Sequence, residues 1–181
     1  GDGASERIFG DGLAGRASEV FIATKVGHGE ADPRAVVERS LVNLRVPVLD
    51  LVQVHGTTYS DDLADRLLGP DGTVAVLERM RDEGLIRHIG FTTEDQNSAV
   101  YRFIKSGRFD VMQICYNVVH MHAHEFTRPF GSIPADVEAG MGVVTMRTLT
   151  SGMFQKWMRT IRPDDDFDYS PSLLQFVLSD P

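Results

Sequence analysis

Two side chains of the sequence stand where they could take part in proton transfer. Lys25 and His55 each come at the end of an apolar, strand-like run, and a glycine follows each of them within two residues. At the carboxyl end of a buried strand, a lysine ammonium can lower the pKa of a neighbouring hydroxyl by its charge. An imidazole there can donate a hydrogen bond to a carbonyl oxygen or move a proton. Spacing alone leaves two alternatives open, a solvated cation and an ordinary hydrogen-bonded loop histidine.

Five strand-like runs and the helical patterns between them would position these two residues. The runs are short and rich in Val and Ile, as in strands that are buried on both faces. They cover Val20–Val26, Leu49–His55, His88–Thr93, Val111–Tyr116 and Gly142–Met146. Apolar residues at helical spacing follow each run, at Val37–Leu44, Val74–Met80, Val100–Ile104, Ala135–Ala139 and Leu174–Leu178.

The repeated order of strand and helix predicts an α/β fold with a parallel sheet. Right-handed crossovers bring the carboxyl ends of all strands to one side, where ligands bind in such folds. A doubly wound nucleotide-binding sheet should carry G-x-G-x-x-G after a strand, but the Gly-rich stretch 1–15 follows no strand. This counts against the doubly wound sheet. The competing architecture is a (β/α)8 TIM barrel, which would be incomplete here, with about five of its eight strands present. Residues 1–181 are expected to form a single domain, truncated at both ends.

The composition argues against several classes of protein. The 181 residues include 18 Lys and Arg against 26 Asp and Glu, a net charge of -8. Nucleic acids and anionic membranes attract basic surfaces, so we expect neither as a partner. No apolar run approaches the ~18 residues of a membrane-spanning helix, and no signal peptide is visible. Cys115 is the only cysteine, which indicates a reducing compartment and a cytoplasmic protein.

Six segments, in order along the chain, resemble motifs of the aldo-keto reductase family. Val20–Lys25 resembles the "ATK" strand, Leu49–His55 resembles "LDLYQIH", and Glu83–Thr93 resembles "EGKIRAIGVSN". Further along, the matching segments resemble "VVQVEYN", "GVIAYSPLASG" and "LRWVLSNP", and they cover Val111–Asn117, Gly142–Gly152 and Leu174–Pro181. Each match is weak by itself, but the ordered set covers nearly the whole chain.

This resemblance implies a barrel that binds NADP(H) across the carboxyl ends of its strands and reduces a small-molecule carbonyl by hydride transfer. In the family a Tyr donates the proton, a Lys paired with an Asp supports that Tyr, and a His orients the carbonyl. Lys25 and His55 fall on the Lys and His positions. The resemblance therefore implies catalytic roles for both residues.

The sequence departs from the family pattern at its ends. Gly1–Glu6 resembles the segment that follows the catalytic Tyr in "YGxSE", so we expect a Tyr directly before Gly1 and an Asp a few residues earlier. The segment that grips the cofactor's ribose phosphate would come after Pro181. An inactive barrel that binds nucleotide as a sensor or regulatory subunit is the alternative to a reductase. Tyr59 is a conceivable substitute acid, although an exposed loop tyrosine is the simpler interpretation.

Five positions match residues that contact the cofactor in the family. Thr92 and Thr93 replace a Ser-Asn pair that grips the carboxamide, and Gln113 matches a Gln with the same task. Met146 occupies the place of an aromatic residue that stacks on the nicotinamide, and Arg147 could reach a phosphate, which Arg binds well. Alternatively, Gln113 has a structural role, Met146 is an ordinary core residue, and Arg147 forms a surface ion pair.

Three further features suggest no chemistry of their own. His120, His122 and His124 alternate as metal ligands on a strand could, but no acidic or Cys partner has suitable spacing, so we expect no metal site. Cys115 lies between apolar residues and is expected to be an inert buried thiol. Asp50 is expected at the amino end of its strand, the side that serves stability in barrels.

Overall fold

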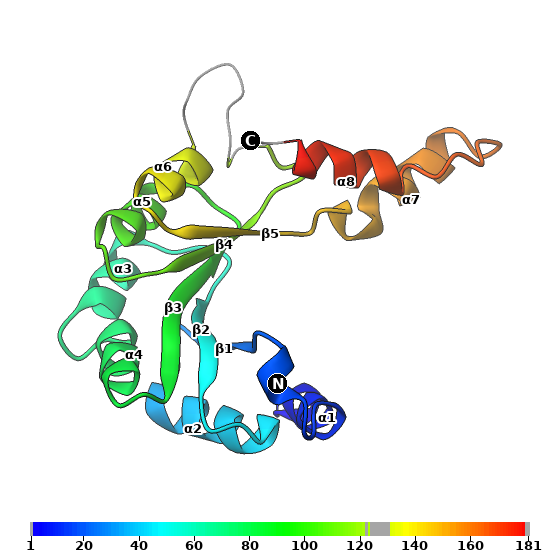
Figure 1. Cartoon of the computed structure of the whole chain (residues 1–181). Helices are drawn as coiled ribbons and strands as arrows, with labels where there is room; N and C mark the ends of the chain where they lie inside the picture. The colour runs from blue at the N-terminus through cyan, green and yellow to red at the C-terminus, as the bar shows by residue number, and fades with distance from the viewer. Residues whose placement is uncertain (1, 122, 124–130, 180–181) are drawn as a thin grey trace.

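The computed structural model describes residues 2–121, 123 and 131–179. Its centre is a five-stranded sheet in the order β1-β2-β3-β4-β5, and all four strand pairs are parallel. The strands are β1 (Ala23–Gly27), β2 (Leu49–His55), β3 (Ile86–Thr93), β4 (Val111–Cys115) and β5 (Gly142–Met146). The predicted α/β fold with a parallel sheet is confirmed (Figure 1).

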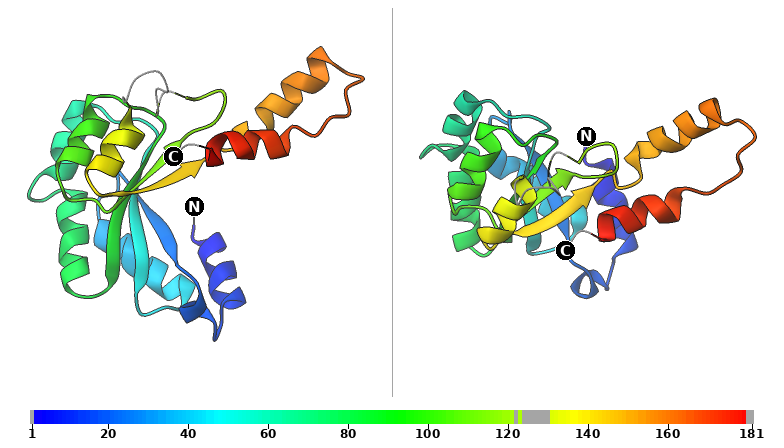
Figure 2. Two further views of the ribbon diagram at one scale, coloured as in Figure 1. Left: turned by 45° about the horizontal axis from the view of Figure 1, so that its top comes forward. Right: turned by 90° about the horizontal axis from the view of Figure 1, so that it is seen from above.

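Helices precede and follow these strands. They are α1 (Ala4–Gly12), α2 (Pro33–Leu44), α3 (Asp61–Leu68), α4 (Thr73–Asp82), α5 (Ser98–Lys105), α6 (Ser132–Glu138), α7 (Met153–Ile161) and α8 (Ser170–Leu178). Figures 1 and 2 show α2 to α6 along one face of the sheet, whereas α1 lies beside β1 and α7 and α8 extend away from β5. Within residues 2–121, 123 and 131–179, no layer of helices covers the other face of the sheet.

Local signals explain where several helices begin. The Asp32 side chain accepts a hydrogen bond from Ala35 N at 3.0 Å, and Pro33 takes the first helical position of α2, as Asp32 and Pro33 in the sequence predict. Helix α3 begins in the same way, because the hydroxyl of Ser60 accepts a hydrogen bond from Leu63 N at 3.2 Å. Helix α3 was not predicted from the sequence.

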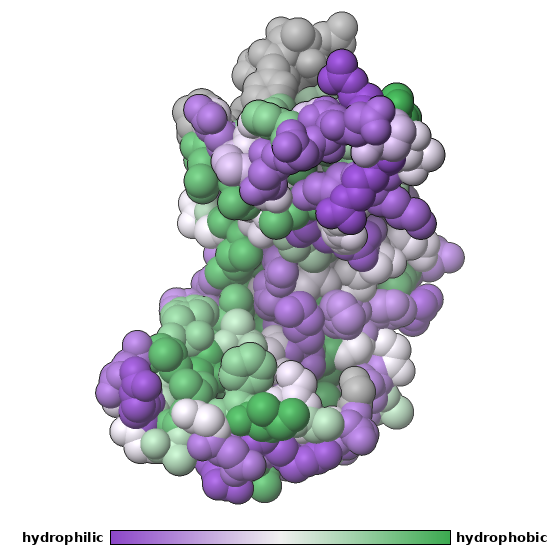
Figure 3. All heavy atoms as spheres, turned by 90° about the vertical axis from the view of Figure 1, so that its right-hand side faces the viewer, coloured by the Kyte–Doolittle hydropathy of each residue, from purple (hydrophilic) through white to green (hydrophobic). Residues whose placement is uncertain are grey.

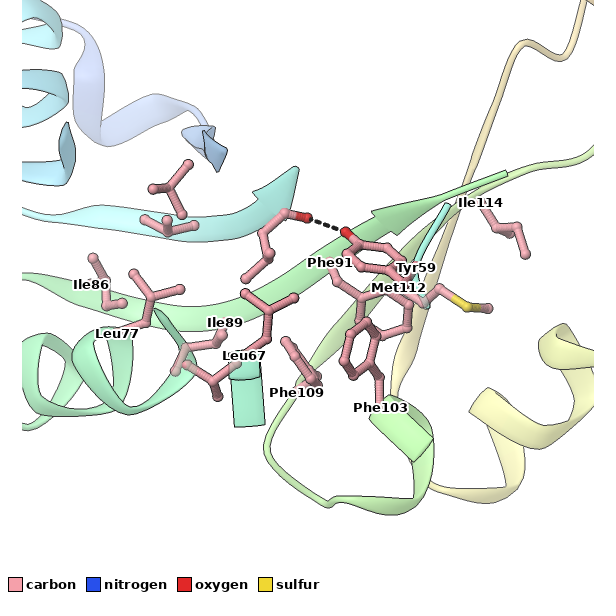
Figure 4. Packing of buried hydrophobic residues seen from close by; sticks show 14 of the residues in the cluster. Tyr59, Leu67, Leu77, Ile86, Ile89, Phe91, Phe103, Phe109, Met112 and Ile114 are labelled. Carbon is pink, nitrogen blue, oxygen red and sulfur yellow. Dashed lines mark hydrogen bonds between the residues drawn. The ribbon is translucent and has the colours of Figure 1, made fainter. Parts of the chain in front are cut away.

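The helix-covered face holds the main core. Alternate residues of the central strands point into it, as Val54, Phe91 and Met112 do, and each is at most 1% exposed. Phe91 meets Phe103 of α5 with ring centroids 5.2 Å apart and Phe109 with centroids 5.0 Å apart, both edge-on. Figure 4 shows this aromatic cluster between the sheet and α5. Such packing fixes β3 and β4, whose carboxyl ends carry candidate site residues.

The strand register decides which side chains point to the other, inner face. Lys25 pairs with Gln53, and Thr92 pairs with Gln113. Residues two apart on a strand share a face, so His55 joins Gln53 on this side. The inner face thus carries polar side chains near the carboxyl ends of β1 to β4. Among the described residues, no helix has the length and apolar character that crossing a membrane requires.

Candidate active site

Lys25 and His55 lie on neighbouring strands at the carboxyl edge of the sheet. Lys25 is the third residue of β1, and His55, the last residue of β2, pairs in register with Gly27. Both side chains line one hollow of about 830 Å³ between the edge of the sheet and α1. The structure thus brings the two residues to a shared pocket.

The electrostatics of this pocket keep the His55 imidazole neutral. Partial burial lowers the pKa of His55, and the nearby positive charges of Lys25 and His28 lower it further. A neutral imidazole carries one N–H donor and one acceptor nitrogen. His55 can therefore donate a hydrogen bond to a carbonyl oxygen at neutral pH without itself adding a positive charge.

Glu6 of α1 lines the same pocket, and the sequence analysis did not single it out. Its carboxylate accepts hydrogen bonds from the Thr24 hydroxyl at 2.7 Å and from Asn43 Nδ2 at 3.0 Å. Burial by itself raises the pKa of Glu6, but these hydrogen bonds outweigh it, and the pKa is lowered. The ionised carboxylate joins α1, β1 and α2, and so fixes one wall of the pocket.

Tyr59 is buried, so the expectation of an exposed loop tyrosine was wrong. Its side chain is packed against Phe103 with ring centroids 4.9 Å apart, and the residue is 2% exposed. Its hydroxyl donates to the carbonyl oxygens of Val54, at 3.1 Å, and Thr92, at 3.0 Å. Burial raises the pKa of this hydroxyl far above its ordinary value. These contacts give Tyr59 a structural role and not that of a substitute acid.

The hydroxyls of Thr92 and Thr93 both bond to neighbouring backbone. Thr92 Oγ1 donates to Gly56 O at 2.7 Å and accepts from Gly56 N at 3.0 Å. Thr93 Oγ1 accepts from Asp95 N at 3.0 Å and lies 3.4 Å from Thr57 O. Both threonines are at most 2% exposed. Neither hydroxyl is free in this structure to grip a carboxamide.

Gln113 and Met146 lie near each other on the inner face. Gln113 pairs with Val144, and Met146 pairs with Cys115, two residues further along the same two strands. Both side chains are half-buried. The Gln113 amide makes no hydrogen bond to any residue that the structure describes, so it can bind a ligand without first breaking a protein contact.

Arg147 forms a two-point ion pair at the carboxyl end of the sheet. Its guanidinium nitrogens lie 2.9 Å and 2.7 Å from the two carboxylate oxygens of Glu94. Glu94 follows β3 and Arg147 follows β5, so the pair reaches across the end of β4. Arg147 has a φ of 56°, and its carbonyl oxygen accepts from Asn117 Nδ2 at 3.0 Å. Glu94 directly follows β3, and the buried Asn117 comes two residues after β4. Neither was predicted from the sequence.

The remaining candidates form no second site within the described part of the chain. Cys115 is 1% exposed, and burial raises the pKa of its thiol, as expected of an inert cysteine. No group of three metal-ligating side chains occurs among the residues that the structure describes. His122 and His124 lie outside those residues.

The chain is similar to known proteins of one family. The model of the Aldo/keto reductase family matches residues 1–178. The uncharacterized oxidoreductase YqkF of Bacillus subtilis is 24% identical over 137 residues, which are 68% of this chain and 42% of that protein. The chain thus spans less than half the length of this curated relative.

Solved structures show the same fold. The holo form of aldo-keto reductase AKR11C1 from Bacillus halodurans superposes with a TM-score of 0.73 at 23% identity, over 98% of this chain and 65% of that one. An aldo/keto reductase from Klebsiella pneumoniae, in complex with NADP and acetate, superposes with a TM-score of 0.69 at 22% identity, over 98% and 62%. The five-stranded sheet therefore corresponds to part of a (β/α)8 barrel, as predicted.

Proposed function

The chain belongs to the aldo/keto reductase family, and on that premise we propose that the protein is an NADP-dependent reductase of small aldehydes or ketones. The observation that carries the proposal is the shared pocket of Lys25 and His55 at the carboxyl ends of two neighbouring parallel strands. Ligands bind at this end of the strands in barrel enzymes. The Klebsiella pneumoniae relative in complex with NADP supports the choice of cofactor.

The pocket residues would act on the carbonyl oxygen. That oxygen gains negative charge as its carbon accepts a hydride, and a preorganised donor stabilises this charge. The neutral His55 would donate a hydrogen bond to the oxygen and hold the carbonyl in place. The Lys25 ammonium would lower the pKa of a hydroxyl beside it and so favour proton transfer from that hydroxyl to the oxygen.

The residues on the inner face fit a nicotinamide cofactor in part. The Gln113 amide is half-buried and free of described partners, so it could pair with a carboxamide, and Met146 could pack against the ring. Arg147 could meet a phosphate if it left Glu94, whereas the hydroxyls of Thr92 and Thr93 are already bonded. When bound, the cofactor would supply the hydride. We therefore propose Gln113, Met146 and Arg147 as cofactor contacts.

The alternative, nucleotide binding without turnover, depends on whether the pocket of the whole protein holds a phenol donor. The structure describes all four tyrosines of the chain, and none of them lines the pocket of Lys25 and His55. A barrel whose pocket receives no phenol donor could bind NADPH as a sensor or regulatory subunit. Binding of NADPH with no oxidation by any aldehyde would support this second function.

The direct test is NADPH oxidation with an aromatic aldehyde, followed by absorbance. We expect His55→Ala to lower kcat/KM about a hundredfold, because the carbonyl oxygen loses its donor, while the Kd of NADPH changes little. His88→Ala is the matched control, since His88 is a half-exposed histidine at the opposite end of the sheet. Equal rates for the wild type and His55→Ala would remove His55 from the mechanism.

A further inference from the structure

The backbone directly after His55 is held by one side chain. Both backbone polar groups of Gly56 bond to Thr92 Oγ1. The N–H of Gly56 donates to it at 3.0 Å, and the Gly56 carbonyl oxygen accepts from it at 2.7 Å. Thr92 is 2% exposed, and Gly56 is buried as well, so water does not compete for these bonds. One hydroxyl thus uses its donor and an acceptor on the residue that follows His55.

The backbone on the other side of His55 is held by Tyr59. The phenol hydroxyl donates to the carbonyl oxygens of Val54 and Thr92, which ties the residue before His55 to the same end of β3. Figure 4 shows Tyr59 beside Phe91 and Phe103, with its hydroxyl aimed back at the strand. The ring lies so close to Gly56 that a Cβ on that residue would be 2.5 Å from the Tyr59 hydroxyl oxygen.

The carbonyl group of His55 itself is also engaged. It accepts a hydrogen bond from His28 N at 3.3 Å, and the His28 ring meets the edge of Tyr59 with centroids 6.0 Å apart. The peptide groups before, at and after His55 are thus all bonded to buried or neighbouring structure. Three anchors around one residue leave its Cα little freedom, and the direction of its side chain follows from that of the Cα–Cβ bond.

We propose that Thr92 and Tyr59 are positioning residues that aim the His55 imidazole into the pocket. This proposal rests on the proposed function, in which His55 orients the substrate carbonyl. Thr92 would then serve the reaction through Gly56, and not by gripping the cofactor carboxamide as the family resemblance implies. The reason is energetic, because a hydroxyl that completes two buried hydrogen bonds leaves both peptide groups unsatisfied if it turns to a ligand.

The decisive variants are Thr92→Val, which keeps the shape of the side chain and removes the hydroxyl, and Thr92→Ser, which keeps the hydroxyl. We expect Thr92→Val to lower kcat about tenfold or more, because small misplacements of a reacting group are costly, with the Kd of NADPH within about twofold of the wild type. The pKa of His55, followed by NMR of its imidazole, should rise toward its ordinary value as the freed loop admits water. Thr92→Ser should restore both.

Ser106→Ala is the control for lost stability. Ser106 Oγ also donates to a carbonyl, that of Phe103 at 2.6 Å, and accepts from an amide, that of Arg108 at 3.2 Å. It lies after α5, away from the pocket. We expect this variant to lower the thermal unfolding midpoint without changing kcat or the pKa of His55.

Tyr59→Phe tests the second anchor, because it removes only the hydroxyl. It should shift the pKa of His55 in the same direction as Thr92→Val, and the double variant should shift it by less than the sum of the two, since both anchors act on one loop. If Thr92→Val raised the Kd of NADPH about fivefold and left the pKa of His55 unchanged, the proposal would be overturned. Thr92 would then be a residue that contacts the cofactor.

The NMR measurement needs neither substrate nor turnover. If the wild type does not oxidise NADPH, the proposed function fails, yet the shift in the pKa of His55 still decides whether Thr92 and Tyr59 hold that residue. A folded Thr92→Val variant with the His55 pKa of the wild type would refute the positioning role whatever the activity.

Discussion

Asp136 buries a carboxylate that has no partner in the described part of the chain. The residue lies in α6, which packs against α5 and β5, and it is 0% exposed. Neither carboxylate oxygen has a hydrogen-bond partner among the residues that the structure describes, and burial raises the pKa of the group to about 7. A buried charge without a partner costs stability, so Asp136 is expected to weaken the fold at neutral pH.

We predict that Asp136→Asn stabilises the protein in a pH-dependent way. The pKa in the folded state, about 7, exceeds the ordinary 3.8, so the folded chain holds more protons than the unfolded chain between these values. Stability of the wild type therefore falls as the pH rises through this window. The gain in Asp136→Asn should be small near pH 4 and reach up to about 4 kcal/mol near pH 8.

Urea denaturation at several pH values would measure this difference. Glu138→Gln is the control, because Glu138 is an exposed acidic residue of the same helix. We expect its free energy of unfolding to follow that of the wild type. Equal stability of Asp136→Asn and the wild type near pH 8 would show that the buried carboxylate finds a partner in solution.

At the amino ends of the strands, one carboxylate joins three of them. Asp50 of β2 accepts a hydrogen bond from Ile22 N at 2.7 Å, directly before β1, and its other oxygen pairs with Arg87 of β3. The Asp50 side chain is 12% exposed, whereas that of Arg87 is 64% exposed. The expected position of Asp50, on the side opposite the active site, agrees with the structure.

We predict that Asp50→Ala lowers the free energy of unfolding by about 2 kcal/mol, because a buried N–H loses its charged acceptor. Arg87→Ala should cost less than about 1 kcal/mol, since its ion pair is solvated. Neither change should alter the Kd of NADPH, because neither residue lines the pocket of Lys25 and His55. Thermal and urea unfolding would show whether Asp50→Ala loses more free energy of unfolding than Arg87→Ala. An equal loss in the two variants would contradict the prediction.

The sequence predicted the strands better than the helices, for a physical reason. Short runs rich in Val, Ile and Leu are typical of parallel strands, so β2, β4 and β5 are visible in composition alone, although β1 starts at Ala23 and β3 at Ile86. Helices α1, α3 and α7 were missed. Helix α7 buries none of its residues. Its apolar side chains therefore pack into no core within the described part of the chain.

The sequence likewise predicted one part of the site, Lys25 and His55, and missed the contacts of Thr92 and Tyr59. Lys25 and His55 could be placed because a residue at a strand end keeps its position in any parallel sheet. The bonds of Thr92 to Gly56, and the burial of Tyr59, depend on the path that residues 56–60 take back over β3. That path is set by tertiary packing on Phe103, which no local pattern encodes.

Considered as a whole, the described part of the chain leaves both edges of its sheet open. Within it, β1 pairs only with β2 and β5 only with β4. Val144 of β5 is 46% exposed on the inner face, and Phe9 and Phe21 near the other edge are 60% and 63% exposed. Figure 3 shows hydrophobic surface on this side of the molecule, over the part where α1 and β1 lie, next to a hydrophilic region at the height of α7 and α8.

We predict that the 181-residue polypeptide, expressed by itself, associates with its own copies. Open strand edges next to apolar surface pair readily with other chains, and a charge near such an edge opposes pairing. The mass from size-exclusion chromatography with light scattering should rise with protein concentration, and Val144→Lys should reduce that rise. Val42→Lys, on the outer side of α2 where Val42 is 75% exposed, adds the same charge away from the edges and should leave it unchanged. A monomer at every concentration, or an equal effect of the two variants, would mean that the open edges do not drive association.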